Sequence, residues 1–404
     1  MNLRSLAQAG HWPTLLMAFL YFDMSFMVWV LLGPLAVHIA ADLGLTPAQK
    51  GMMVAIPVLS GALLRILLGA MVDHIGPRRT GLIGQAVVIA ALVWAWLAGL
   101  HSLTAVHALG VLLGVAGASF AVALPLASRW YPPESQGLAL GIAGAGNSGT
   151  VLAALFAPTL ANLFGWNSVF GLALIPLGIT LVVFFLFARD APDRPAPQRL
   201  TQYFTVLRDA DTWWFMFFYS VTFGGFVGLA SSLVIYFNDQ YRLSPVIAGL
   251  FTAACVFAGS MFRPIGGALA DRHGGVRSLS FLYIIAAASL ALVSFAPASR
   301  WLALGLFFVA MMALGMGNGA VFQLVPQRFR REIGVMTGLV GMAGGIGGFY
   351  LAASLGWSKQ WTGNYQTGLL MFASLAIIAL IGLTGVKRRW RTTWGASSVS
   401  AARI

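Results

Sequence analysis

The sequence is short of charge. Only 9% of its 404 residues are charged, whereas about a quarter of an ordinary soluble domain is. The 24 basic and 11 acidic side chains are too few to cover a soluble protein of this length, which excludes a cytosolic enzyme and a nucleic-acid-binding module. The single cysteine, Cys255, lies within an apolar run and therefore excludes a disulfide scaffold or a cysteine metal cluster.

Long apolar runs take the place of charge. Hydrophobic residues make up 59% of the sequence, and a helix needs about 20 apolar residues to cross a bilayer. At that length the sequence predicts twelve transmembrane helices, and so an all-α membrane protein embedded in the lipid bilayer. The predicted spans are 14–37, 48–71, 80–99, 103–126, 138–161, 167–188, 211–237, 246–269, 278–296, 301–324, 334–356 and 366–386.

The basic residues are distributed unevenly between the two ends of these spans. With the N-terminus inside, 18 of the 24 fall in inner segments, 4 in outer loops, and Arg65 and Arg263 within spans. Because basic loops are retained in the cytoplasm, we expect a multi-pass protein of the cytoplasmic membrane with both termini in the cytoplasm. The net charge of +13 is therefore a topology signal, and no nucleic-acid partner is expected.

The two halves of the sequence repeat each other at an offset of 198 residues. The residues that recur are Gly61, Arg65, Gly69, Asp73 and Gly76, matched by Gly259, Arg263, Gly267, Asp271 and Gly274. Twelve spans then divide into two six-helix bundles, 1–189 and 211–386, with a cytoplasmic linker at 190–210 and a cytoplasmic tail at 387–404. Bundles with an even number of spans share one orientation, which suits a carrier that exposes a central site to alternate sides.

Several motifs point to a family. The loop at 69–79, Gly-x3-Asp-x2-Gly-x-Arg-Arg, and its echo at 267–274, Gly-x3-Asp-Arg-x-Gly, resemble the inter-helix motif of the major facilitator superfamily. The stretches 141–150 (GIAGAGNSGT) and 338–348 (GLVGMAGGIGG) resemble the paired signatures of its nitrate/nitrite porter family, and 60–65 (SGALLR) matches that family's arginine-bearing second helix. The resemblance covers nearly the whole chain. It implies the major facilitator fold and a bacterial carrier of nitrate, with nitrite as a second substrate.

The signature glycines are first expected to form close helix-packing surfaces. Smooth contacts of this kind would also let the spans at 138–161 and 334–356 slide as the halves rock. These glycines are Gly141, Gly144, Gly146, Gly149, Gly341, Gly344, Gly345 and Gly348.

Arg65 and Arg263 are the most informative residues. A guanidinium stays protonated, and placing one at the bilayer centre costs at least ~2.5–3.5 kcal/mol, so each must face the bundle interior and find a partner. There are two alternatives for each arginine. It either donates to helix carbonyls or a carboxylate and holds two helices together, or it binds an anion. Since Asp23 is the one obvious deep acid, we expect a pocket that stays positive until an anion enters. Two planar forks suit a planar oxyanion; bicarbonate and formate fit as well as nitrate and nitrite, and the choice of nitrate rests on the resemblance.

The resemblance also implies that Asn147, Phe120, Tyr219 and Phe223 line the substrate. An amide would contact the anion, and aromatic rings present positive edges and exclude water. The alternative for Asn147 is a hydrogen bond across a helix interface. For the rings it is ordinary core or lipid-facing packing, because the sequence holds 28 phenylalanines.

Asp23 is a candidate for proton coupling. An intramembrane carboxylate acts either as a proton carrier or as the partner of an arginine. Proton-coupled uptake is expected if Asp23 titrates, and nitrate/nitrite exchange if it stays ionised.

Charged residues near the inner ends of the spans form clusters in both halves. Solvated loop charge is one explanation. In the superfamily interpretation they form a cytoplasmic gate, a set of ion pairs and helix-end contacts that keep the inner side closed in the outward-facing state. The gate candidates are Asp73, Arg78, Arg79, Glu134, Asp271, Arg272, Arg277 and Glu332.

Other classes of membrane protein fit less well. The stretch 146–149 resembles the serine motif of rhomboid proteases, but the histidine after it, His273, lies in a predicted loop, so no dyad forms in the membrane. No lysine stands in a phosphate-cradling loop, which excludes an ATP-driven pump. A passive anion channel stays open as an alternative, and flux measurements separate it from a carrier. We therefore expect a carrier and not an enzyme, with no catalytic residue, cofactor, metal or obligate protein partner.

Overall fold

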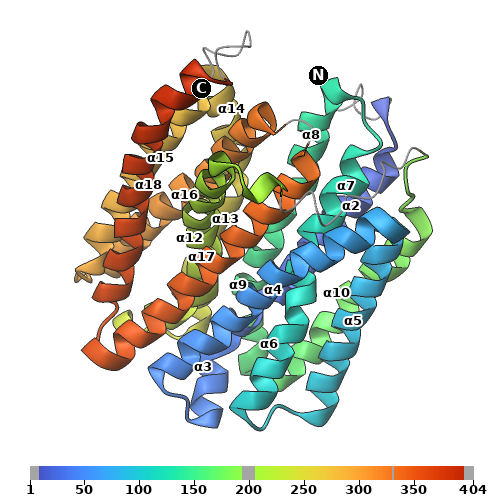
Figure 1. The fold of residues 1–404 in the computed structure, drawn as a ribbon. Helices are drawn as coiled ribbons and strands as arrows, with labels where there is room; N and C mark the ends of the chain where they lie inside the picture. Colours follow the sequence, from blue (N-terminus) through green and yellow to red (C-terminus); the bar gives the residue numbers. More distant parts are fainter. Residues whose placement is uncertain (1–8, 193–204, 330–331, 395–404) are drawn as a thin grey trace.

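The computed structural model describes residues 9–192, 205–329 and 332–394, and within these ranges it contains helices and no strand (Figure 1). Twelve helical spans are long and apolar enough to cross a membrane. The predicted all-α membrane fold is therefore confirmed. Four of the spans are interrupted, because α2 and α3, α6 and α7, α8 and α9, and α13 and α14 each share one span.

The helices follow each other with short turns. The first half contains α2 (Trp12–Trp29), α3 (Leu32–Leu43), α4 (Pro47–Ile75), α5 (Pro77–Ala98), α6 (Leu103–Gly117), α7 (Phe120–Ser128), α8 (Pro133–Gly144), the 3-10 turn η1 (Ala145–Ser148), α9 (Gly149–Phe164) and α10 (Trp166–Phe187). The second half contains α12 (Ala210–Tyr241), α13 (Pro245–Met261), α14 (Arg263–His273), α15 (Gly275–Ser294), α16 (Arg300–Arg328), α17 (Ile333–Thr362) and α18 (Gln366–Thr392). The last helix thus continues six residues past 386, where the predicted bundle ends.

The backbone carries the 198-residue repeat. Residues with positive φ end corresponding helices in the two halves, where glycine is favoured because it lacks a Cβ. The pairs are Gly44 and Arg242 (φ 64° and 54°), Gly76 and Gly274 (90° and 94°), and Gly165 and Gly363 (81° and 76°). The two halves therefore turn at the same points.

The two halves are closed against each other at one side of the bundle. We call the side where α2 begins and α18 ends the terminal side (Figure 1), and the opposite side, where α4 begins, the far side. On the far side, Lys50 of α4 forms an ion pair of 2.9 Å with Asp239 of α12, and the Tyr365 hydroxyl donates to the same carboxylate at 2.7 Å. Burial, and then the charge of Asp239, raises the pKa of Tyr365, so the phenol stays protonated and keeps donating.

The contact between α4 and α17 runs from the far side to Arg65 and stops there. The two helices lie side by side (Figure 1) and antiparallel. A Cβ on Gly51 would lie 2.7 Å from the Gly356 Cα, and one on Gly345 would lie 2.5 Å from the Ala62 Cβ. Towards the terminal side, Gly69 of α4 and Gly334 of α17 would meet nothing within 4 Å. Arg65 therefore lies at the inner end of a tightly packed seam between the halves.

We predict that Gly315→Ala destabilises the fold. A Cβ on Gly315 of α16 would lie 1.9 Å from the Gly259 carbonyl oxygen of α13, and overpacking of this kind typically costs about 1–3 kcal/mol. Gly305→Ala on the same helix is the matched control, because a Cβ there meets nothing within 4 Å. Thermal unfolding of the purified variants in detergent measures both. Equal unfolding temperatures for the two would contradict the packing described.

Candidate anion site

Arg65 is almost completely buried, with 2% of its surface exposed. Its Nη1 donates a short hydrogen bond to the Gly341 carbonyl of α17, and its Nε and Nη2 lie 3.4 and 3.5 Å from the Gly117 carbonyl oxygen of α6. A side chain at position 341 would press on the guanidinium, since a Cβ there would lie 3.0 Å from Nη1. Arg65 thus forms the carbonyl contacts that the sequence allowed as an alternative, and it joins the two halves.

Arg263 occupies the equivalent position in the second half but has different surroundings. It is the first residue of α14, after the interruption at Phe262, and Pro264 follows it. Since proline has no N–H, the helix bond from position 264 to the Ser260 carbonyl is missing. The Arg263 Nη1 is buried without a hydrogen-bond partner in the described part of the chain. Within the same residues, neither arginine forms an ion pair with a carboxylate.

The Phe120 ring of α7 lies next to both guanidinium groups. Its centroid is 5.4 Å from the Arg65 Cζ and 6.0 Å from the Arg263 Cζ. On α12, Phe223 lies 5.0 Å from the Arg65 Cζ and stacks on Tyr219 at 5.2 Å. The structure therefore brings the three predicted aromatic residues together around the two arginines.

Two more aromatic residues belong to this cluster and were not predicted. Phe322 of α16 lies 5.9 Å from the Arg263 Cζ and meets the Tyr219 ring edge-on at 5.0 Å. Trp29 of α2 lies 5.9 Å from the Arg65 Cζ, and its Nε1 donates to the Pro57 carbonyl at 2.7 Å. The repeat offered a signal for Phe322, because the residue one turn before it, Asn318, is the repeat partner of Phe120.

Asn147 lies in the 3-10 turn η1 and is 1% exposed. Its carbonyl oxygen accepts a hydrogen bond of 3.4 Å from the Ser260 hydroxyl, three residues before Arg263. Its side-chain Oδ1 has no partner among the described residues. Asn147 thus contacts the second half next to Arg263, with amide capacity to spare.

Three of these residues lie where a span is interrupted. Phe120 begins α7 after the break at 118–119, Asn147 lies in η1, and Arg263 begins α14. Short 3-10 segments within helices often mark functional hinges, and broken helices line the substrate sites of many carriers. The interruptions therefore coincide in depth with the arginine cluster.

Asp23 of α2 is paired with a hydroxyl, and no arginine of the described residues forms an ion pair with it. The Ser148 hydroxyl donates to its Oδ1 at 2.6 Å, and Asp23 is 6% exposed. Close packing fixes this contact, because a Cβ on Gly149 would lie 1.7 Å from the Asp23 carbonyl oxygen. The carboxylate and the two arginines are thus separate features of the site.

The signature glycines divide into two groups. A Cβ would lie 3.0 Å or less from its nearest neighbour at Gly146, Gly149, Gly341, Gly344, Gly345 and Gly348. At Gly141 and Gly144, however, a Cβ would meet nothing within 4 Å, which differs from the close packing predicted there. Both glycines lie in the last turn of α8, before η1, where no neighbouring atom comes that close.

The gate candidates that form contacts do so within one half. Asp73 pairs with Arg129 at 3.1 Å, and the Arg78 N–H donates to Asp190 at 2.9 Å. The side chain of Glu134 is not among those that the structure describes. For Asp271, Arg272, Arg277 and Glu332 the described part of the chain shows no ion pair.

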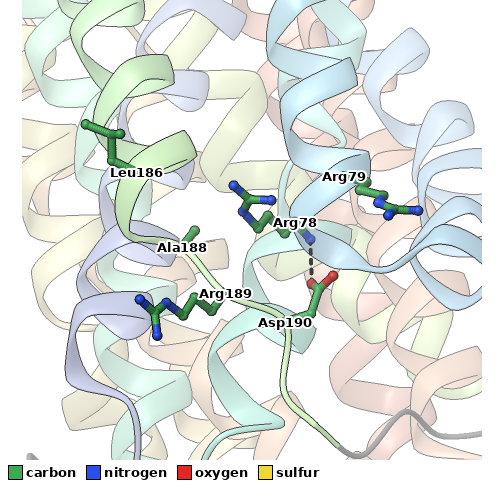
Figure 2. Close-up of a pocket in the computed structure, with 6 residues that line it drawn as sticks. All are labelled: Arg78, Arg79, Leu186, Ala188, Arg189 and Asp190. Atoms are coloured by element: carbon green, nitrogen blue, oxygen red, sulfur yellow. Dashed lines mark hydrogen bonds between the residues drawn. The ribbon is translucent and has the colours of Figure 1, made fainter.

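An open pocket of about 380 Å³ lies at the terminal side, next to these candidates. Figure 2 shows the residues that line it, which come from the start of α5, the end of α10 and the segment that follows α10. They are Arg78, Arg79, Leu186, Ala188, Arg189 and Asp190. None of the residues of the arginine cluster lines it. The cluster itself is filled by aromatic rings and helix carbonyls.

Comparison with known proteins identifies the family of the chain. Residues 16–352 match the Major Facilitator Superfamily. The chain is 33% identical over 356 residues to a nitrite extrusion protein of Bacillus subtilis (88% of this chain, 89% of that one) and 35% identical over 369 residues to a probable nitrate/nitrite transporter of Mycobacterium tuberculosis (88% and 91%). In fold it is similar to a bacterial homologue of the lysosomal transporter Spinster, with a TM-score of 0.70, 19% identity, and 93% and 96% coverage.

Proposed function

This chain belongs to the nitrate/nitrite porter family of the major facilitator superfamily, and we propose that it carries nitrate or nitrite across a membrane by alternating access. It is a multi-pass membrane protein and a transporter by family, not an enzyme. The observation that carries the proposal is the pair Arg65 and Arg263. One cation comes from each half, both lie within 6.0 Å of one ring, and neither has a carboxylate partner in the described residues.

The electrostatics of this pair explain why an anion drives the cycle. Two like charges in a medium of low dielectric repel each other, so the halves close around the empty site only at a cost. A bound planar oxyanion accepts paired N–H bonds from the guanidinium forks and removes the repulsion. Because a ligand shifts a conformational equilibrium by its differential affinity, the anion favours the state in which both forks reach it.

The terminal side is proposed to face the cytoplasm, as the distribution of basic residues predicts. The far side is held closed by Lys50 and Asp239, and the seam between α4 and α17 ends at Arg65. The structure then corresponds to an inward-facing state. In the outward-facing state, the gate candidates at the terminal side would form contacts between the halves.

Coupling is proposed to use Asp23. The carboxylate is buried and accepts a hydrogen bond from Ser148, the residue after Asn147, and it has no ion pair with an arginine among the described residues. An intramembrane carboxylate of this kind serves proton relays. Proton-coupled uptake is therefore the first mechanism. Nitrate/nitrite exchange is the second, and it is supported by a relative from Thermus thermophilus whose name is probable nitrate/nitrite antiporter.

Replacement of either arginine of the cluster by lysine is predicted to abolish transport and leave the fold intact. Lysine keeps the charge but loses the planar fork that binds two oxygens at once. Arg65→Lys and Arg263→Lys should lower nitrate uptake into proteoliposomes by at least about a hundredfold. Arg300→Lys, at an exposed position on the far side, is the matched control. Wild-type uptake by both Arg65→Lys and Arg263→Lys would overturn the proposed clamp.

Phe322→Ala is predicted to raise the half-saturating nitrate concentration several-fold. Without the ring, water reaches Arg263 and screens its attraction for the anion. Phe322→Leu should fall between the alanine variant and the wild type, because it keeps the apolar volume. Phe308→Ala, a half-buried phenylalanine on the same helix, serves as control. An unchanged concentration dependence in Phe322→Ala would remove the ring from the site.

Asp23→Asn distinguishes the two coupling mechanisms. If Asp23 carries the proton, this variant should lose nitrate uptake driven by a pH gradient but retain counterflow of labelled nitrate against internal nitrate. The measurement is uptake into proteoliposomes with either gradient imposed alone. Proton-driven uptake at the wild-type rate would exclude Asp23 as the carrier, and strict dependence of the wild type on internal nitrite would establish exchange.

A further inference from the structure

Asn318 of α16 is a buried amide without a partner. It is 1% exposed, and neither its Nδ2 nor its Oδ1 forms a hydrogen bond with any described residue. Leaving a buried polar group unsatisfied is costly, and such groups in native structures usually have a specific reason. An apolar residue of similar shape would avoid that cost. The amide therefore has its full hydrogen-bonding capacity available for a group bound beside it.

The position of Asn318 in the fold places it at the arginine cluster. Phe322, one turn later on the same face of α16, contacts Arg263 and Tyr219. The flanking glycines fix the helix between two others, since a Cβ on Gly317 would lie 2.6 Å from the Thr222 side chain of α12 and one on Gly319 would lie 2.3 Å from the Arg263 carbonyl oxygen of α14. Asn318 thus lies between α12 and α14 at the level of Arg263.

The internal repeat gives an independent argument. Asn318 follows Phe120 by 198 residues, and the Phe120 ring contacts both guanidinium groups. The repeat partner of Asn147 is Gly345, so the second half lacks an amide in its glycine signature. An amide from the second half is present instead on α16, at the position that meets the arginines in the first half.

We propose that Asn318 is an anion ligand, whose Nδ2 donates to an oxygen of the oxyanion held between Arg65 and Arg263. This assignment rests on the proposed function and adds a residue to its site. Arg65 already donates to two helix carbonyls, so the oxygens of the anion need donors besides the two forks. The Asn147 amide supplies one from the first half, and Asn318 supplies one from the second. The unpaired Arg263 Nη1 is a donor available to the Asn318 Oδ1.

The test replaces Asn318 by leucine in the full-length protein. Asn318→Leu keeps the shape and removes the unsatisfied amide, so the variant should unfold at the same temperature as the wild type or higher when no nitrate is present. The half-saturating concentration of sodium nitrate, measured by thermal stabilisation and by uptake into proteoliposomes, should rise about ten- to hundredfold. Asn318→Ala provides the same measurement if the leucine does not fit. Ser231→Ala, which removes a buried hydroxyl without a partner from the far-side half of α12, should likewise keep or raise the unfolding temperature but leave the half-saturating nitrate concentration unchanged.

The outcomes separate this assignment from the proposed function. A wild-type response to nitrate in folded Asn318→Leu or Asn318→Ala, together with its loss in Arg65→Lys, overturns the role of Asn318 and keeps the proposed function. A lower unfolding temperature with an unchanged half-saturating concentration shows a structural role and also overturns the assignment. If the wild type itself responds to neither nitrate nor nitrite, the proposed function fails and the assignment fails with it.

Discussion

A permanent cation inside a membrane protein has to be solvated by the protein, and two such cations shape the centre of this fold. Water and carboxylates are the usual partners of a guanidinium, and the described residues provide neither an ion pair nor high exposure for Arg65. Helix carbonyls and ring faces replace them. Because these partners carry no full charge, the centre stays electropositive. The tight seam of glycines between α4 and α17 is what brings a carbonyl of the second half to an arginine of the first.

The two arginines share a position in the repeat and differ in how far their donors are satisfied. Arg65 lies within the continuous helix α4 and contacts carbonyls of both halves. Arg263 begins a new helix segment before Pro264 and keeps an unpaired Nη1. A single sequence difference contributes to this divergence, since Ile66 stands where the second half has Pro264. The arginine at the interruption between α13 and α14 thus has the donor with spare capacity, while the arginine of the continuous helix α4 maintains the contact between the bundles.

The sequence predicted the spans, the repeat and the arginine pair, because apolar length, charge and glycine spacing leave clear marks in a sequence. The four predicted residues around the pair, Asn147, Phe120, Tyr219 and Phe223, followed from the family resemblance. It did not predict that Arg65 binds the Gly341 carbonyl, since every residue has a carbonyl and no side chain marks the one that is used. Phe322 was missed for a related reason: it is one of 28 phenylalanines, and only the packing of α16 against Arg263 distinguishes it. The open surroundings of Gly141 and Gly144 were also not predicted, because glycine spacing alone does not show which glycines have a neighbouring helix within contact distance.

The interruptions at 118–119, 145–148 and 262 lie at the depth of the cluster and not at the membrane surfaces. When a helix bends at its middle, a small rotation of its two segments about that point moves both ends of the helix by ångströms and the centre hardly at all. The transported anion would then be bound at the point of bending, in a nearly constant environment, while the entrances on the two sides of the membrane open and close. A molecule that binds at one entrance and prevents it from closing would therefore inhibit transport without resembling the transported anion.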